Sequence, residues 1–301
     1  MQKLLSIIIV SFNSKNYLKD CLDSLQKSTI VNKTEIIIID NASSDGTGNF
    51  IKKHYPKVIF KKNKVNLGFA KANNIGINIS QGKFVLLLNP DTIIPKNTLG
   101  FMVDFLEKKK DAGVATCLVE LVDGQIDDAC HRGFPTPWNS LCHFSGVSRF
   151  FPGSKFFNGY HLGFRDLDKT HEIDSCTGAF MLIKRSVGQK IKFLDEDYFW
   201  YGEDLDFCFR IKKSGFKVFF VPHVKIYHYK GVSSGIKKHS EALSTATFET
   251  RLKAQNARFE VMKIFYKKHY SKGINRLLTP LIFAAINFKK WLTLIGLKRK
   301  I

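Results

Sequence analysis

Residues 4–10 read LLSIIIV, and residues 35–40 read EIIIID. Both are short, almost continuous runs of β-branched and aliphatic residues, which is typical of parallel strands that are covered on both faces. Between them, apolar residues recur at helical spacing, namely Tyr17, Leu18, Cys21, Leu22 and Leu25. Strand, helix and strand in this order predict a βαβ unit.

The same alternation continues through the first third of the chain. A helix that contains Phe50 and Ile51 is expected next, and a short strand at Val58–Phe60 follows. After these come a helix at Ala70–Ile79 and a strand at Phe84–Leu88. The predicted fold class is therefore α/β with a mostly parallel central sheet.

The second half of the chain is less regular. Residues 119–173 are rich in Gly, Pro and aromatic residues and show little periodicity, so we expect long loops around a site. Regular patterns return at Thr177–Lys184 and Leu205–Lys213, and Val218–Val221 predicts a strand.

Composition indicates a globular protein. A chain of 301 residues with 44% hydrophobic content can bury a core. The six cysteines are scattered without a CxxC pair, so we expect reduced cytosolic thiols rather than a zinc site or a disulfide framework. Lys3 and the apolar run after it resemble the start of a signal peptide. The run is short and lacks a cleavage site, however, so a buried strand fits better.

The end of the chain is strongly basic. Of the formal net charge of +21, residues 251–301 contribute +12, with 13 Lys and Arg against the single acid Glu260. Within Pro280–Ile301, Lys289 and Lys290 separate two apolar runs, and neither approaches the ~20 residues that cross a bilayer. We therefore expect residues 241–301 to form a basic amphipathic helical region on a membrane surface. Packing on the rest of the chain or on a partner subunit is the alternative.

Polar residues follow several predicted strands, where ligands collect in open α/β sheets. They are Ser11, Asn13, Asp40, Asn41 and Asp91. An acid such as Asp40 after a strand is typical of dinucleotide sites. The first strand has no glycine fingerprint after it, however, so NAD is not expected.

The stretch YGEDLD at residues 201–206 places Glu203, Asp204 and Asp206 between aromatic and apolar residues. Ionised acids cost several kcal/mol each to desolvate unless something uses or pairs them, so this setting favours a site that needs bases and cation ligands. The alternative is a helix N-terminus, where acids complement the exposed N–H groups.

Seven motifs in a characteristic order resemble those of family 2, GT-A-fold glycosyltransferases, and most of all the rhamnosyltransferase-like branch. The motifs are Ile7–Asn13, Ile38–Thr47, Asn66–Gly76, Leu86–Thr92, Thr177–Lys184, Tyr201–Arg210 and His228–Ser233. The resemblance covers residues 4–235 and implies a GT-A catalytic domain at 1–240 with C-terminal helices after it. The nucleotide-sugar half would span about 1–118 and the acceptor half about 119–240.

The resemblance implies a nucleotide-diphosphate sugar donor and a divalent cation, Mg²⁺ or Mn²⁺. Asp91 matches the last position of the family's Asp-x-Asp motif and would be a metal ligand. Asn89 replaces the first acid of that motif, which departs from the pattern for tight metal binding. His228 matches the position of a second metal ligand, with a structural histidine as the alternative.

The resemblance also assigns the donor side. Asp40 would accept a hydrogen bond from a pyrimidine base, and Lys71 would face the diphosphate. The nucleoside pocket would be completed by Ser11, Asn13 and Asn41, with Asn89 also on the nucleotide-sugar side. Turn and cap chemistry is the alternative for the loop after Asp40, at Ser43, Ser44 and Asp45. Lys71 alone would need no explanation as a surface lysine.

On the acceptor side, a carboxylate must take the proton of the attacking hydroxyl. Motif position implies Asp204 as this base, with Glu203 orienting it or the acceptor. Asp206 is expected to pair with Arg210 one helical turn on. Two aromatic residues, Trp200 and Tyr201, would stack on an acceptor sugar or pack in the core.

The favoured function is thus inverting transfer of a sugar, with rhamnose as a candidate, to a growing lipid-linked surface glycan. The expected location is cytoplasmic, at the inner face of the cell membrane. Two alternatives are a non-catalytic nucleotide-sugar-binding subunit and a basic nucleic-acid-binding protein. No nucleic-acid-binding motif accompanies the charge, so no nucleic-acid partner is expected.

Overall fold

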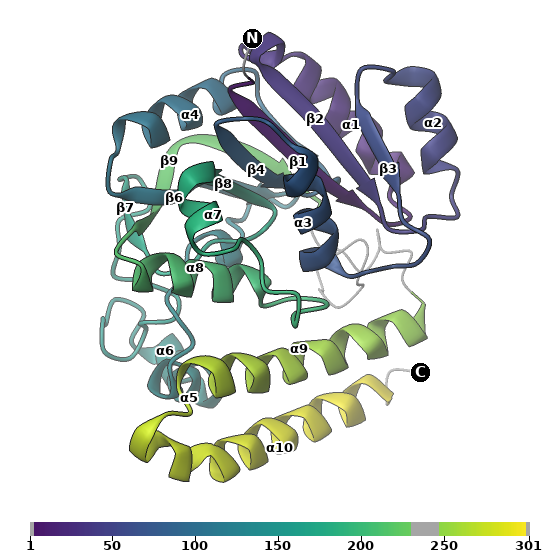
Figure 1. Cartoon of the computed structure of the whole chain (residues 1–301). Helices are drawn as coiled ribbons and strands as arrows, with labels where there is room; N and C mark the ends of the chain where they lie inside the picture. The colour runs from purple at the N-terminus through teal and green to yellow at the C-terminus, as the bar shows by residue number, and fades with distance from the viewer. Residues whose placement is uncertain (1–2, 230–246, 299–301) are drawn as a thin grey trace.

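The computed structural model describes residues 3–229 and 247–298. A twisted sheet forms the centre, and two long C-terminal helices lie below it (Figure 1). The strands are β1 (Leu5–Ser11), β2 (Thr34–Asp40), β3 (Ile59–Lys62), β4 (Phe84–Leu88), β5 (Thr92–Ile93), β6 (Ala112–Leu121), β7 (His171–Ile173), β8 (Phe180–Lys184) and β9 (Lys217–His228).

Helices are distributed along the whole chain. The α-helices are α1 (Lys15–Gln26), α2 (Thr47–His54), α3 (Phe69–Ile79), α4 (Thr98–Lys108), α5 (Pro137–Ser145), α6 (Val147–Phe150), α7 (Arg185–Lys190), α8 (Glu203–Lys213), α9 (Phe248–His269) and α10 (Thr279–Lys298). Short 3₁₀ turns include η1 (Val31–Lys33), η2 (Asp128–Cys130) and η4 (Gly273–Leu278).

The sheet has the strand order β3-β2-β1-β4-β8-β6-β9-β5, and β7 also pairs with β9. The first four strands of this order are parallel, and β6 and β9 are parallel to each other. Only β8, β5 and β7 run antiparallel to their neighbours. The prediction of a mostly parallel sheet is therefore confirmed.

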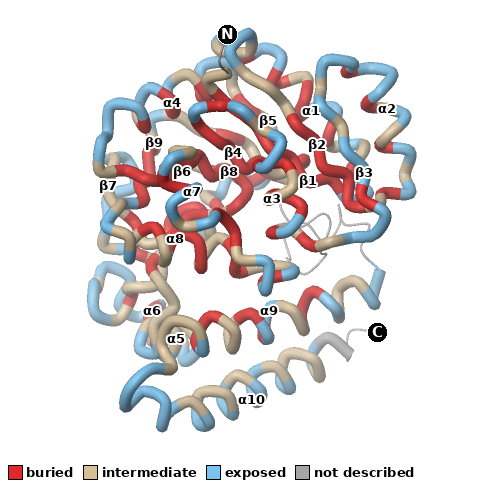
Figure 2. The backbone as a smooth tube through the Cα atoms, in the orientation of Figure 1, coloured by how far each residue is buried: buried red, intermediate tan, exposed pale blue. Residues whose placement is uncertain are grey.

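The apolar runs become strands because both faces of the sheet are covered. Every residue of β1 is buried, and helix α3 packs on β1 and β2 (Figure 2). Gly76 permits this close approach, since a Cβ at this position would lie 2.5 Å from a methyl group of Ile8. A larger side chain there would push α3 off the sheet.

The expected elements of the first third are all present. The strand expected at Phe84–Leu88 is β4 with the same bounds, and the helix expected at Ala70–Ile79 is α3. Later, the strand expected at Val218–Val221 is only the start of β9. Its register against β6 shifts next to Pro222, and pairing then resumes as far as His228. Proline supplies no N–H for the ladder, which explains the irregularity.

The segment at 119–173 is mainly loop, as expected, but it contains α5, α6 and β7. Helix α5 has a clear start signal. The hydroxyl of Thr136 accepts a hydrogen bond from Asn139 N, and Pro137 occupies the first turn. The sequence prediction omitted this helix, and it also assigned no structure to α4 or β6.

Helix α9 packs on the rest of the chain and forms a second small core. Val261 and Phe265 contact Tyr198, which lies in the loop before α8. Gly202 allows the contact, because its φ is +83° and an added Cβ would lie only 2.1 Å from Val261. Packing on the rest of the chain, the alternative considered for the tail, therefore holds for α9.

Helix α10 is far less covered. It runs back along α9, where Lys290 pairs with Glu260 at 3.1 Å (Figure 1). Within the described residues, one helical segment, Gly273–Gly296, is long and apolar enough to cross a membrane, and none of it is buried. The sequence analysis expected a helical tail but argued against a segment long enough to span a bilayer, because Lys289 and Lys290 separate the two apolar runs. In the structure both runs belong to one helix.

Candidate functional site

The carboxyl ends of β1, β2, β4 and β9 lie at one edge of the sheet. Ser11 and Asp40 are direct neighbours in the β1–β2 register. Asn89, the residue after β4, lies at the same edge, where its N–H donates to Ala179 O just before β8 at 3.2 Å. Polar residues from distant parts of the chain therefore meet at one edge, as the sequence predicts.

The loop after β2 is fixed by side-chain hydrogen bonds. Asn13 has a φ of 49°, and its side chain accepts a hydrogen bond from Ser44 N at 2.9 Å. Its own N–H donates to Ser43 Oγ at 2.9 Å. Asp45 accepts hydrogen bonds from Lys15 N and Thr47 N. The turn and cap roles considered for this loop are therefore present.

Asp40 is fully buried beneath this loop. Its Oδ2 accepts a hydrogen bond from Ser43 N at 3.3 Å and lies 4.0 Å from Lys62 Nζ. Within residues 3–229 and 247–298, Oδ1 has no hydrogen-bond partner. A buried carboxylate oxygen without a donor is costly, so the site leaves Asp40 able to accept from a ligand.

Asn41 has a structural environment. Its Nδ2 donates to Gly68 O at 3.1 Å, and its Oδ1 accepts from Asn63 Nδ2 at 2.9 Å. These bonds tie the loop before α3 to the end of β2. Lys71 is exposed on the first turns of α3, and Ser11 Oγ lies 2.9 Å from Ser14 Oγ.

Asp91 and His228 meet because β5 pairs with β9. Thr92 lies opposite His228 in this register, so Asp91 Oδ1 is 3.3 Å from His228 Nε2. Asn89 Nδ2 is 3.2 Å from the same ring nitrogen. The pairing that the resemblance implied is therefore present in space. The rest of that motif, residues 230–233, lies outside the described part of the chain.

Behind His228 lies a carboxylate that sequence reasoning missed. Asp127 is fully buried, its Oδ2 is 3.5 Å from His228 Nδ1, and its Oδ1 accepts from Ala129 N at 2.8 Å. Such a partner on the second ring nitrogen orients an imidazole. Burial disfavours the charged ring, but Asp91 and Asp127 outweigh it and raise the pKa of His228 to about 9.

These side chains fit a cation site in part. Two ligand atoms that are each about 2.1 Å from one ion, at right angles to each other, lie about 3 Å apart. The distances from His228 Nε2 to Asp91 Oδ1 and to Asn89 Nδ2, 3.3 and 3.2 Å, are close to this value. A half-turn of the Asn89 side-chain amide places its oxygen, in place of its nitrogen, toward the same point. Among the described residues, no group of three or more His, Cys, Asp and Glu side chains could hold a metal ion. Remaining ligands would have to come from elsewhere.

Asp204 stands at the start of α8 and is paired with an arginine. Arg132 Nη2 donates to Asp204 Oδ2 at 2.5 Å, and both side chains are only 13% exposed. Burial opposes the charge of Arg132, but Asp204 outweighs it and raises the pKa of the guanidinium. An ion pair with this much burial is well shielded from solvent screening.

Glu203 lies inside the protein beside this pair. Its side chain is buried, and its Oε2 has no hydrogen-bond partner in the described parts of the chain. Burial, and next the charge of Asp204, raise the pKa of Glu203 to about 8. This carboxyl group is therefore protonated at neutral pH.

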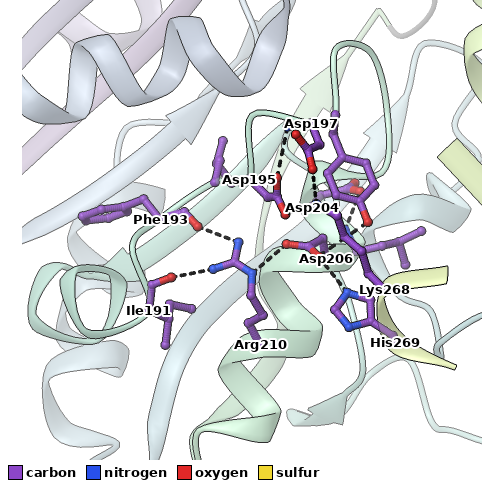
Figure 3. A network of polar contacts seen from close by, with 12 residues as sticks. Ile191, Phe193, Asp195, Asp197, Asp204, Asp206, Arg210, Lys268 and His269 are labelled. Carbon is purple, nitrogen blue, oxygen red and sulfur yellow. Dashed lines mark hydrogen bonds and ion pairs between the residues drawn. The ribbon is translucent and has the colours of Figure 1, made fainter. Parts of the chain in front are cut away.

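Asp206 is structural, as expected. Its Oδ2 accepts from Arg210 Nε at 2.7 Å, one turn along α8. Figure 3 shows that His269 from α9 also meets Asp206, with Nε2 at 2.7 Å from Oδ1. Lys268 pairs with Asp195 and Asp197 beside it. The acids of this stretch thus divide between the site and the attachment of α9.

Tyr201 and Trp200 precede α8 in a strained turn. Tyr201 has a φ of 74°, which is rare for a residue with a large side chain, and Gly202 after it also has a positive φ. The two aromatic rings are stacked, with centroids 5.7 Å apart. This strained turn sets the direction in which α8 begins, and with it the position of Glu203 and Asp204.

Two cavities flank these acids without containing them. One of about 310 Å³ adjoins the loop after β2 and is lined by Ser43, Ser44, Gly46, Thr47, Gly48, Asn49, Lys52, Phe60 and Lys62. One of about 360 Å³ lies where α8 meets α9 and is lined by Phe134, Phe209, Lys212, Lys213, His269 and Lys272. Asp91 and Asp204 line neither of these two cavities.

The fold and the polar residues at the strand ends fit a GT-A glycosyltransferase that uses nucleotide sugars. The comparisons with known proteins give the same class. Residues 6–192 match the model of glycosyl transferase family 2, and the chain belongs to this family. The chain is similar in fold to a mannosyltransferase of Pyrobaculum calidifontis, solved with GDP-Man and Mn²⁺. The TM-score is 0.59 at 16% identity, over 95% of this chain and 70% of that one. The protein is therefore a glycosyltransferase.

Two curated relatives are rhamnosyltransferases. The chain is 28% identical to rhamnosyltransferase WbbL of Escherichia coli over 231 residues, which is 74% of this chain and 82% of WbbL. It is 25% identical over 247 residues to the N-acetylglucosaminyl-diphospho-decaprenol L-rhamnosyltransferase of Mycobacterium tuberculosis, which is 78% of this chain and 79% of that enzyme. The resemblance to the rhamnosyltransferase-like branch is thus confirmed. The alternative of a nucleic-acid-binding protein is not supported.

Proposed function

We propose that the protein transfers a sugar of the rhamnose type from a nucleotide-diphosphate donor to a lipid-linked glycan, with inversion at the anomeric carbon. The donor sugar and the lipid-linked acceptor are inferred from the names of the two rhamnosyltransferases. The observations that support the proposal are the contact of Asp91 with His228 and the buried Arg132–Asp204 pair at the start of α8, in a chain of family 2.

We propose that Asp91 and His228 hold a divalent cation, with the Asn89 side chain beside them and diphosphate oxygens of the donor completing the ligand set. When bound, the cation neutralises charge that develops on the diphosphate leaving group. A set of oxygen and imidazole donors suits Mn²⁺ as well as Mg²⁺. Asp127 would keep Nε2 of His228 directed at the ion.

The proposed donor pocket lies over the ends of β1 and β2. The open acceptor atom of Asp40 would receive a base N–H, and Ser11, Asn13 and Asn41 would surround the nucleoside. Lys71 would face the diphosphate from the exposed side of α3. Asn41 would act mainly through the loop that it holds, because its amide already bonds to Gly68 and Asn63.

The proposed base is Asp204. As the acceptor oxygen bonds to the anomeric carbon, the bond from that carbon to the diphosphate breaks, and the hydroxyl proton passes to the Asp204 carboxylate. Arg132 occupies Oδ2 and fixes the orientation of the carboxylate. Glu203, being protonated, would donate a hydrogen bond rather than add a second charge. Trp200 and Tyr201 would contact the acceptor sugar.

We further propose that residues 1–240 act as the catalytic unit and that residues 241–301 attach it to the inner face of the cell membrane. The support is the basic charge of the tail and the exposed apolar helix at its end. The enzyme would then work at the surface where a lipid-linked acceptor resides.

A thermal-shift screen of UDP-, dTDP- and GDP-sugars, with and without Mn²⁺, tests the proposal, because a ligand of the folded state raises its apparent stability. We expect one donor to give a Mn²⁺-dependent shift that Asp91→Ala removes. A shift by no donor, or one that is equal with chelator present, would contradict the cation-dependent donor site.

A further inference from the structure

Exposed aromatic and aliphatic side chains gather on two segments that are far apart in the chain. The first consists of α5, α6 and the loop after them, residues 137–157, and is called the α5–α6 segment. In it, Phe150 and Phe156 are 81% and 62% exposed. The second is α10, where Leu281, Phe288 and Trp291 are exposed. Their spacing of seven and then three residues puts the three on one stripe of the helix. We call these five residues and the surface between them the two-part face.

The two segments adjoin in space. Lys289 of α10 lies over the ring of Phe144 in α5, with Nζ 5.9 Å from the centroid. Phe156 in turn packs on Trp138 of α5, with centroids 4.9 Å apart. Figure 1 shows α5 and α6 beside the pair formed by α9 and α10. The segments that carry the exposed residues are therefore neighbours in the folded protein.

Charge is distributed unusually over both segments. Residues 129–165 contain no Asp or Glu, and neither do residues 261–301. The α5–α6 segment carries Arg149 and Lys155, and the α10 segment carries Lys289 and Lys290. Exposed aromatics among cations, without acids, are the composition of surfaces that rest on anionic lipid.

A second copy of this chain does not suit the face. In a two-fold dimer the same patch meets itself, so cations would face cations, and neither segment has an acid of its own to pair with those of the other copy. A membrane-spanning α10 does not suit it either. Lys290 pairs with Glu260 of α9, and Lys289 contacts Phe144, so the middle of α10 is held against the protein. Crossing a bilayer would place both lysines in hydrocarbon.

We propose that the two-part face docks on an anionic bilayer surface, with the α5–α6 segment as a second anchor beside α10. This inference builds on the proposed lipid-linked acceptor. It also has a consequence for the site, because α5 begins at Pro137, shortly after Arg132, the partner of Asp204. The second anchor would therefore hold the acceptor side of the site toward the lipid headgroups.

The test is co-sedimentation of the full chain with vesicles of phosphatidylcholine that contain 30% phosphatidylglycerol, or about one lipid in three. We expect Phe150→Ser/Phe156→Ser to weaken vesicle binding at least tenfold, and Phe288→Ser/Trp291→Ser to do the same. Phe101→Ser, at an exposed aromatic residue of α4 outside the face, should stay within twofold of the unchanged chain. Thermal unfolding of each variant confirms that it is folded.

Unchanged vesicle binding by folded Phe150→Ser/Phe156→Ser, beside a loss in the α10 variant, would overturn the second anchor. A concentration-dependent dimer that both double variants abolish, with vesicle binding intact, would assign the face to a second copy instead. Sugar transfer to a water-soluble acceptor is measured in parallel. If that transfer is absent while vesicle binding follows the prediction, the proposed function fails and the docking face stands.

Discussion

The proposed donor side and the proposed acceptor side of the site are built in different ways. On the donor side, Ser11, Asp40 and Asn89 follow directly from the ends of neighbouring strands, so the sheet register alone brings them together. On the acceptor side, Asp204 depends on Arg132, 72 residues earlier in the chain, and on a helix attached by α9. The first region is fixed by local pattern, and the second is assembled by long-range contacts.

This difference implies that the acceptor side is more easily disturbed. Two of its acids are held by ion pairs, Arg132–Asp204 and Arg210–Asp206. The donor loop is instead held by several hydrogen bonds between side chains and backbone. Substitutions on the acceptor side should therefore separate turnover from donor binding.

The largest expected effect is that of Asp204→Asn. Loss of the base should lower kcat by about 10²- to 10⁴-fold while donor binding stays intact, because the amide cannot take the hydroxyl proton. Steady-state transfer and calorimetric donor binding measure the two quantities. The matched control is Asp197→Asn, an exposed acid in the preceding loop, which should leave turnover nearly unchanged. Near-normal turnover of Asp204→Asn would show that Asp204 is not the base.

Arg132→Met should have the next largest effect. A base that is displaced by about 1 Å can lose on the order of 10²-fold in rate, and this variant leaves Asp204 without its buried partner. Arg132→Lys keeps the charge but not the planar fork, so we expect an intermediate rate. The readouts are kcat against acceptor KM and the pH profile of kcat. Equal kcat in all three proteins would show that the ion pair only supports the fold.

Asp127→Asn tests the proposed donor side, where His228 would bind the cation. Removal of the carboxylate behind His228 should weaken Mn²⁺ binding about 10- to 100-fold, as for other partners of metal-binding histidines. Titration of Mn²⁺ by electron paramagnetic resonance measures this without any turnover. Asp123→Asn, an exposed residue in the same loop, is the control. Unchanged affinity in Asp127→Asn would mean that the ring is oriented by other contacts.

The smallest expected effect concerns stability. Burial raises the pKa of Glu203 to about 8 from 4.5, so the folded protein retains a proton that the unfolded chain has released. Stability should therefore fall as pH rises from about 4.5 to about 8, by at most ~1.4 kcal/mol per pH unit from this group. Glu203→Gln should flatten that slope. Urea denaturation at pH 5, 6.5 and 8 measures it, and identical slopes for both proteins would contradict a buried neutral Glu203.

Sequence reasoning succeeded where local pattern controls the structure. The buried run at Phe84–Leu88 could only become a covered strand, and the polar residues after it had to lie at the sheet edge. Asp91 and His228 were brought together only by the family resemblance, and the β5–β9 pairing supplies the physical reason.

Arg132 and Asp127 could not be predicted in the same way. They lie in the segment without periodicity, and their partners are 72 and 101 residues further along the chain. One signal was available: residues 129–165 contain no acid, so a buried arginine in this stretch must find its carboxylate elsewhere. The helical tail was predicted, but a segment long and apolar enough to span a bilayer was not, because two lysines divide the apolar sequence of α10. In the structure these lysines contact Glu260 and Phe144.

The most direct measurement is the anomeric configuration of the product, read by proton NMR during transfer from the donor that the binding screen selects. The predicted result is an inverted product from the unchanged protein and far less product from Asp204→Asn at equal donor occupancy. Retention of configuration would contradict direct displacement assisted by Asp204.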